Sequence, residues 1–373
     1  MFSEKNLINC DTSFRKFISS CLDENIISID TEFVRNKTFF PKLCLLQIGT
    51  SKGSYAIDTN KITILPLLKK ILMNNGILKI FHSPRQDIEI FFNLFGSLPK
   101  NIFDTQIAYS FISQDYQISY EKLVLNILKI KLDKTYQYYD WSLRPISEQQ
   151  LNYALNDVHY LRKIYFKIKH KLKSKHRYHW AQEESKVYLN KKLYLNSPED
   201  YWKNIYLSKT KNLNLFKLKN ICEWRENKCI NSNISRKLIF SDKDIILLIK
   251  NPKILKALSI KYKLKQKDLI IIDKILSNNE SITLEKKTKV LNNNFELLNV
   301  LKIILKLISN ETDISPNLIA STADLEKLKF KNNKNSKLFK TWRYEVFGKK
   351  ISQFLNNELK VVVKEKNFFL EKN

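Results

Sequence analysis

Alternating apolar patterns typical of β-strands occur only in the first part of this 373-residue chain. Four short runs, separated by turn residues, have this pattern: 26–29, 44–48, 54–57 and 77–81. The first three predict an antiparallel meander and the fourth a buried strand, while residues 65–73 and 84–95 have helical spacing. We therefore expect residues 1–200 to form an α/β domain, a mixed sheet flanked by helices.

The rest of the chain has the spacing of helices. From about Asp104 onward apolar residues recur at three- and four-residue intervals, and residues 201–373 contain no convincing β alternation. A polar stretch at 277–281 and a Lys-rich run at 286–289 indicate a boundary near residue 285. The expectation is two small all-α bundles, at 205–285 and 286–373.

The net charge of +28, from 65 Lys and Arg against 37 Asp and Glu, favours a polyanionic partner such as nucleic acid. Codon bias in an AT-rich genome would give a similar skew, because 56 of the cations are Lys and the chain is rich in Ile and Asn. The charge is unequally divided, +9 over residues 1–200 and +19 over 201–373, which favours the helical half as an electrostatic contact surface.

Several classes of protein are disfavoured. No apolar run approaches the roughly 18 residues that span a bilayer, and no secretory leader is recognised, so we expect a soluble, cytoplasmic protein. Five cysteines without a C-x-x-C spacing predict reduced thiols and no cysteine zinc site. No glycine-rich nucleotide-binding motif is found, and nothing indicates a protein partner.

Asp30 and Glu32 follow the first strand-like run. Residues two apart on a strand project to the same face, so these two carboxylates would lie side by side. Such a pair repels unless a cation lies between its members, and Mg²⁺ or Mn²⁺ prefers oxygen ligands of this kind. The alternative is a pair of exposed acids at the end of a strand.

Two further acids lie on expected helices. Asp87 falls in the first turn of a helix that begins near Pro84, where it could simply complement the helix dipole. Tyr153 and Asp157 are four residues apart and share a helix face, so a phenol and a carboxylate could point into one pocket. A half-buried Tyr beside an exposed Asp is the alternative for that pair.

Together these segments resemble the DEDD exonucleases of the tyrosine-containing branch, specifically the ribonuclease D family. The D-x-E motif matches Asp30 and Glu32, the Asp after a strand matches Asp87, and Y-x-x-x-D matches Tyr153 and Asp157. The segments 140–145 and 180–184 also look like ribonuclease D signatures, and 218–226 is similar to an HRDC domain. The last segment, within residues 286–373, looks like a second HRDC-like bundle. One departure is Ser235, where family members usually have Pro.

The resemblance implies a ribonuclease H-like fold and hydrolytic removal of nucleotides from RNA 3′ ends, with tRNA precursors as the typical substrate. It implies two divalent ions, Mg²⁺ or Mn²⁺, held by Asp30, Glu32, Asp87 and Asp157. Tyr153 would orient the attacking water, because a phenol with a pKa near 10 is a poor general base at neutral pH.

Four other residues are candidates for substrate contacts: Phe33, His82, Trp141 and Arg144. His82 is equally a histidine whose hydrogen bonds are satisfied at a strand end, and the aromatic rings could pack beneath a loop instead of stacking on bases. Asp104, before Thr105, is expected to cap a helix.

Other functions remain open from the sequence alone. The same carboxylates serve DNA exonucleases of this superfamily, and a non-catalytic RNA-binding protein could keep the fold. The bundles could be plain scaffolding. A membrane-surface protein would need a helix with one apolar and one basic face, and the helices here look like bundle helices.

Overall fold

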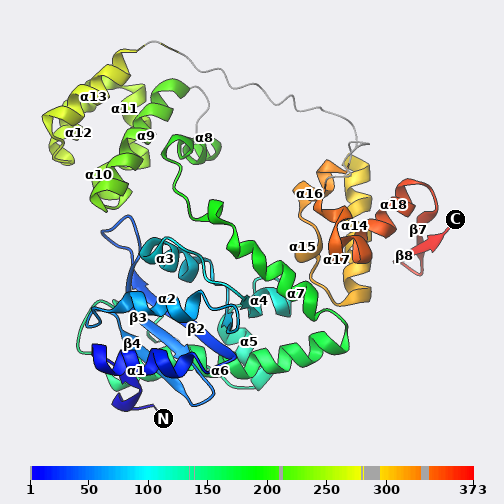
Figure 1. The fold of residues 1–373 in the computed structure, drawn as a ribbon. Coiled ribbons are helices and arrows are strands. Elements are labelled where there is room, and N and C mark those ends of the chain that lie inside the picture. The colour runs from blue at the N-terminus through cyan, green and yellow to red at the C-terminus, as the bar shows by residue number, and fades with distance from the viewer. Residues whose placement is uncertain are drawn as a thin grey trace.

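The computed structural model describes residues 2–133, 135–137, 139–209, 213–278, 280, 295–328 and 336–373. An N-terminal α/β domain is followed by two groups of helices that lie apart from each other (Figure 1). The expected boundary near residue 285 lies outside the described residues.

A six-stranded mixed sheet is the centre of the first domain. Its strands, in chain order, are β1 (Leu7–Ile8), β2 (Ile26–Val34), β3 (Lys42–Gly49), β4 (Ser54–Asp58), β5 (Leu78–Phe81) and β6 (Ile102–Asp104). Their spatial order is β1-β4-β3-β2-β5-β6. The predicted meander is confirmed, because β2, β3 and β4 pair antiparallel in succession, and β5 adds to β2 in parallel. The predicted α/β domain with a mixed sheet is therefore present.

Helices cover both faces of this sheet. They are α1 (Asp11–Cys21), α2 (Lys69–Leu72), α3 (Arg85–Phe95), α4 (Thr105–Tyr109), α5 (Tyr120–Leu128), α6 (Glu148–Ser174) and α7 (Tyr178–Ser185). The predicted helix at 65–73 is divided into a 3₁₀ turn, Leu65–Leu68, and α2. Helix α3 ends as predicted at Gly96, whose φ of 65° is the left-handed conformation of a helix C-cap.

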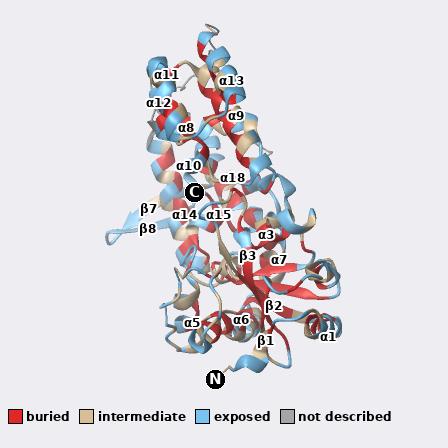
Figure 2. Ribbon diagram, turned by 90° about the vertical axis from the view of Figure 1, so that its left-hand side faces the viewer, coloured by how far each residue is buried: buried red, intermediate tan, exposed pale blue. Residues whose placement is uncertain are grey.

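The sheet separates two packed layers (Figure 2). On one face, Ile27 and Ile29 of β2 pack with residues of α1 and α3, such as Phe14 and Phe91. On the other face, Leu45 of β3 and other apolar residues pack against α6. Because strand residues alternate between faces, the side chains of 28, 30 and 32 on β2 turn toward α6.

The first group of helices comprises α8 (Trp202–Lys209), α9 (Leu215–Ser232), α10 (Arg236–Ile239), α11 (Asp242–Lys250), α12 (Leu255–Lys261) and α13 (Gln266–Ser277). We call it the first bundle. Its core includes Leu218, Phe240 and Leu248, and the same cluster takes in Phe39 from the loop between β2 and β3. The first bundle is therefore packed against the α/β domain at that loop.

The second bundle comprises α14 (Phe295–Thr312), α15 (Pro316–Ile319), α16 (Thr322–Lys327), α17 (Thr341–Arg343) and α18 (Lys349–Leu355). Its core is continuous with that of the α/β domain. The Trp342 ring meets Phe111 edge-on, with centroids 4.7 Å apart, and Arg343 forms an ion pair of 2.6 Å with Glu184 of α7. The second bundle therefore shares apolar and ionic contacts with the first domain.

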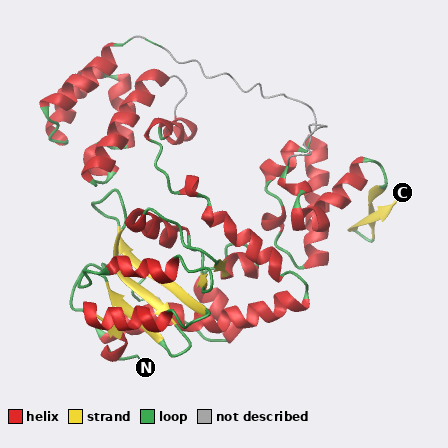
Figure 3. Cartoon of the chain, viewed as in Figure 1, coloured by secondary structure: helices red, strands yellow, loops and turns green. Residues whose placement is uncertain are grey.

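The expectation that the C-terminal region is entirely helical is wrong at its end. Strands β7 (Leu359–Lys364) and β8 (Asn367–Lys372) form an antiparallel hairpin, drawn in yellow at the C-terminus in Figure 3. Residues 361–363 are all valines, whose β-branched side chains suit a strand. The turn residues Glu365 and Lys366 both have positive φ, 48° and 63°, as a two-residue hairpin turn requires. Neither is Gly or Asn, so the usual turn signal is missing.

Candidate active site

Helix α6 lies unusually close to the sheet. Ser28 of β2 donates a hydrogen bond of 2.7 Å from Oγ to the carbonyl of Val158. Gly49 of β3 permits this approach, because a Cβ atom there would lie 2.3 Å from the Ser28 Oγ and 3.0 Å from the Val158 carbonyl oxygen. The start of α6 is held by a capping box between Ser147 and Gln150. Together these contacts bring Asp157 over the middle of β2.

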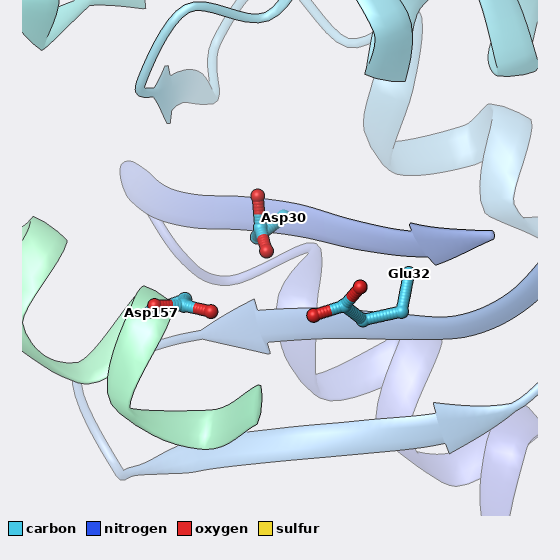
Figure 4. A group of neighbouring side chains, drawn as sticks. All are labelled: Asp30, Glu32 and Asp157. Carbon is cyan, nitrogen blue, oxygen red and sulfur yellow. The ribbon is translucent and has the colours of Figure 1, made fainter. Parts of the chain in front are cut away.

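Three carboxylates converge where α6 crosses β2. Asp30 and Glu32 of β2 and Asp157 of α6 each offer an oxygen atom, and these atoms all lie within 4.8 Å of one another. Figure 4 shows the three side chains turned toward a common point. The alternation along β2 is what puts Asp30 and Glu32 on the α6 face. Three of the four predicted carboxylates are thus brought together.

Asp87, the fourth predicted carboxylate, approaches from α3 on the other side of β2. Its Oδ1 accepts a 2.5 Å hydrogen bond from the Thr31 hydroxyl, between the two acids of the strand. The side chain is buried, and its charge raises the pKa of Asp30 and of Glu32. Asp87 therefore lies outside the group of three but close enough to interact electrostatically with Asp30 and Glu32.

Burial and mutual repulsion dominate the electrostatics of these four acids. Burial is the main cause that raises the pKa of Asp30 and Glu32 well above the usual range, and the neighbouring carboxylates add to it. Burial likewise raises the pKa of Asp87 and Asp157. Carboxylates that are difficult to ionise together are a site for a cation, and a set of hard oxygen donors suits a divalent ion such as Mg²⁺ or Mn²⁺. The donor set fits the expected metal chemistry.

Tyr153 lies one helical turn before Asp157 and is half-buried. Its ring packs against Trp141 and Tyr136, with centroids 6.1 and 6.0 Å away. A cavity of about 680 Å³ opens beside Tyr153 and Asp157 and is lined further by α6 and the loop before it. Burial, followed by the charge of Asp157, raises the pKa of Tyr153, so the phenol keeps its proton at neutral pH.

Two predicted substrate contacts are corrected by the structure. Trp141 is only 2% exposed and packs beneath Tyr153, so its ring is not available for stacking on a base. Arg144 forms a bidentate pair with the buried Asp58, at 2.9 and 2.7 Å, and also donates to the carbonyl of Cys44. Both side chains have a structural role, holding the loop before α6 against the sheet.

The other two candidates differ from each other. Both ring nitrogens of His82 are paired within the protein, with the Thr105 hydroxyl and the Ile118 carbonyl, each at 3.0 Å. Burial lowers the pKa of His82 to about 4, so the ring is neutral and matches the structural alternative. Phe33 is half-buried and packs against the apolar cluster that contains Ile27 and Ile29, and its contact with substrate stays a prediction. Asp104 caps α4 as expected, accepting from the Gln106 amide at 2.8 Å.

Two residues at the start of α5 were not anticipated. The hydroxyl of Tyr120 donates to the backbone carbonyls of Asp157 and Asn156, at 2.5 and 3.1 Å. The carboxylate of Glu121 raises the pKa of Asp157 further. Tyr120 thus supports the turn of α6 that carries Asp157. No local pattern around 120 links it to residue 157, so the sequence offered no signal for either residue.

Comparisons with known proteins agree with this geometry. A family model described as a 3′-5′ exonuclease matches residues 6–173. A ribonuclease D of Bartonella henselae is 35% identical, covering 95% of this chain and 90% of that protein, and one of Zymomonas mobilis is 30% identical, covering 90% of each. The crystal structure of Escherichia coli RNase D has a TM-score of 0.76 at 24% identity, covering 94% of this chain and 98% of that one, and shows the same fold. The chain therefore belongs to the ribonuclease D family of 3′-5′ exoribonucleases.

Proposed function

We propose that the chain hydrolyses the terminal phosphodiester of RNA 3′ ends at the acidic group, using two divalent ions, Mg²⁺ or Mn²⁺. Asp30, Glu32, Asp87 and Asp157 would hold them. The observation that carries this proposal is the convergence of three carboxylates within 4.8 Å, with Asp87 adjacent. When bound, such ions activate water and stabilise charge on the phosphoryl and leaving oxygens.

Tyr153 is proposed to position the nucleophile. Its pKa is raised by burial, so the phenol acts as a hydrogen-bond donor and acceptor and not as a general base. Packing on Trp141 fixes the ring, and the adjoining cavity leaves room beside Asp157. The role of this residue is therefore orientation of a water molecule toward the scissile phosphorus.

The substrate is proposed to be RNA with an extended 3′ end, such as a tRNA precursor, processed in the cytoplasm. The two bundles are proposed to act as HRDC-type domains that hold the RNA upstream of the cleaved end. The excess of +19 over residues 201–373 supports this role. Among the residues that the structure describes, no helix is long and apolar enough to cross a bilayer.

The test is digestion of a 3′-extended tRNA by the purified chain with Mg²⁺ or Mn²⁺, with EDTA as the metal-free control. We expect a ladder of products shortened from the 3′ end, and no products in EDTA. Matched DNA would be cut more slowly if the RNA assignment holds. Equal rates on both would favour the DNA alternative, and no hydrolysis of either would favour a non-catalytic RNA-binding protein.

Tyr153→Phe separates positioning from metal binding. Loss of the hydroxyl should lower kcat by about 10-fold or more while KM stays within a few-fold, because the ring packing is retained. Single-turnover kinetics measures this. An unchanged kcat would show that Tyr153 only packs against Trp141.

A further inference from the structure

A second polar cavity lies where the first bundle meets the α/β domain. The loop between β2 and β3 lies at the start of α10 (Figure 1). The Ser235 amide donates to the Lys37 carbonyl at 2.9 Å, and the Phe40 amide donates to Oδ1 of Asn233 at 3.0 Å. We call this junction the seam. It fixes part of the first bundle against the loop that immediately follows the acidic strand.

Arg236 forms a wall of the seam. Its guanidinium lies over the rings of Phe39 and Tyr201, 4.6 and 4.4 Å from their centroids, and forms an ion pair of 2.7 Å with Glu226. The two rings come from different domains, so Arg236 is clamped between them. A guanidinium fixed in this way loses little further freedom when it binds an anion.

The cavity at the seam has a volume of about 480 Å³ and is rich in hydrogen-bond donors. Its lining includes Arg35, Asn36, Ser235, Arg236 and Lys237. The Oγ of Ser235 is buried and has no hydrogen-bond partner among the described residues. A buried hydroxyl without a partner costs free energy unless a ligand supplies one.

Acidic groups offset part of this positive charge, because Glu226 accepts hydrogen bonds from Nε and Nη2 of Arg236, at 2.9 and 2.7 Å. The acid that lines the cavity is Asp242, and it already accepts a 2.6 Å hydrogen bond from Arg225. Arg35 is paired with Glu89 at 2.9 Å, while Lys237 is exposed and contributes its charge to the opening. Arginine, lysine and hydroxyl donors around one small cavity are the chemistry that recognises phosphate.

We propose that the seam binds a phosphate of the RNA backbone upstream of the cleaved end, an inference that rests on the proposed ribonuclease function. Arg35 is three residues beyond Glu32 on the same segment, so their Cα atoms are separated by at most about 11 Å. An RNA strand whose 3′ end lies at the acidic group can therefore reach the seam. The seam would bind the RNA strand at the junction between the α/β domain and the first bundle.

The test compares Lys237→Ala and Ser235→Ala with Lys250→Ala, in full-length protein. Lys250 is exposed at the end of α11 and does not line the cavity, so its substitution removes the same charge from the same bundle. The substrates are a dinucleotide, too short to occupy both sites, and a longer single-stranded RNA. For each, kcat/KM is measured over a range of salt concentrations.

We expect Lys237→Ala to lower kcat/KM on the longer RNA several-fold and to reduce its log–log salt slope by about 0.7, the value for one lost phosphate contact on a single strand. Ser235→Ala should lower kcat/KM on the longer RNA without changing the salt slope, because it removes a neutral donor. All three variants should hydrolyse the dinucleotide normally. A Lys237→Ala variant that matches Lys250→Ala on the longer RNA would overturn the seam site. Failure of the unsubstituted protein to hydrolyse either substrate would instead overturn the proposed function.

Discussion

Replacing Asp157 by Asn should stabilise the metal-free protein while removing its activity. Among the described residues, the Asp157 carboxylate makes no hydrogen bond, so Asn keeps the shape and breaks no contact. The change removes one negative charge from a group whose oxygens lie within 4.8 Å of one another. Most substitutions destabilise a protein by about 1 kcal/mol, so the predicted sign is unusual.

The geometry sets the size of this effect. Two ionised carboxylates at 4.8 Å would repel each other by about 3 kcal/mol at an effective dielectric constant of about 20, but Asp30 and Glu32, the two partners of Asp157, have a raised pKa and carry only part of this charge. Proton uptake relieves part of this repulsion. The pKa shift of Asp157 from 3.8 to about 8 sets an upper bound of about 6 kcal/mol. Burying the Asn amide also costs free energy, so we expect a gain of about 2–3 kcal/mol near pH 8, or roughly 5–10 °C in the melting temperature of a domain of this size.

The pH dependence gives a second signature. Burial, and then the charge of Glu121, raises the pKa of Asp157 to about 8 from its ordinary 3.8. The folded state then holds a proton that the unfolded state releases, so unfolding free energy falls as pH rises from about 4 to about 8. The Asn variant lacks this loss. The difference in unfolding free energy between this variant and the unsubstituted protein should therefore grow from about pH 4 to about pH 8 and level off above pH 8.

The assay is thermal and urea unfolding of both proteins in EDTA, repeated with excess Mg²⁺ or Mn²⁺. Metal that binds the folded state should stabilise the unsubstituted protein more than the variant. The difference in unfolding free energy between the two proteins should therefore become smaller or change sign. Turnover of the variant with metal should fall by about 10²-fold or more. A variant that is less stable than the unsubstituted protein in EDTA at pH 8 would refute the reasoning.

Two predictions concern structural ion pairs. Glu184→Gln leaves the guanidinium of Arg343, which is 9% exposed, without its bidentate partner, so urea unfolding should show a loss of about 2–4 kcal/mol and proteolysis should release the second bundle more readily. Arg144→Lys loses the fork that holds the buried Asp58 and should cost about 2–4 kcal/mol, with KM for RNA within a few-fold at a temperature where the variant is folded. A raised KM without lost stability would restore Arg144 as a substrate contact.

Periodicity identified the parts of the α/β domain that depend on local sequence. The meander of β2, β3 and β4 follows from apolar runs bounded by turns, and α3 ends at Gly96 because only a residue that tolerates positive φ suits that cap. The hairpin of β7 and β8 was missed because its turn is made by Glu365 and Lys366, residues that rarely adopt positive φ. Rules based on local sequence fail at such a turn, because the pairing of the two strands offsets the strain of turn residues with positive φ.

Motif matching identified residues that meet but not the direction in which each side chain points. Strand spacing paired Asp30 with Glu32 and helix spacing paired Asp157 with Tyr153, and the resemblance to the exonuclease motifs then grouped the three carboxylates. The partner of Arg144 is Asp58, 86 positions away, so no local pattern shows that its guanidinium is already engaged. The role of Gly49 depends in the same way on how closely α6 approaches the sheet.

The charges of the chain imply an order of binding. Without metal, burial and mutual repulsion raise the pKa of the four acids, so they hold protons, and each one that ionises adds a negative charge that repels phosphate, although the chain as a whole carries +28. Two divalent ions would cancel the formal charge of four carboxylates, and the net positive charge of the chain would then draw the RNA 3′ end toward the site. Metal should therefore strengthen RNA binding by more than its direct contacts with the terminal phosphate. A seam that holds an upstream phosphate would keep the strand nearby even while the metal sites are empty, so metal dependence should be steeper for a dinucleotide than for a longer RNA.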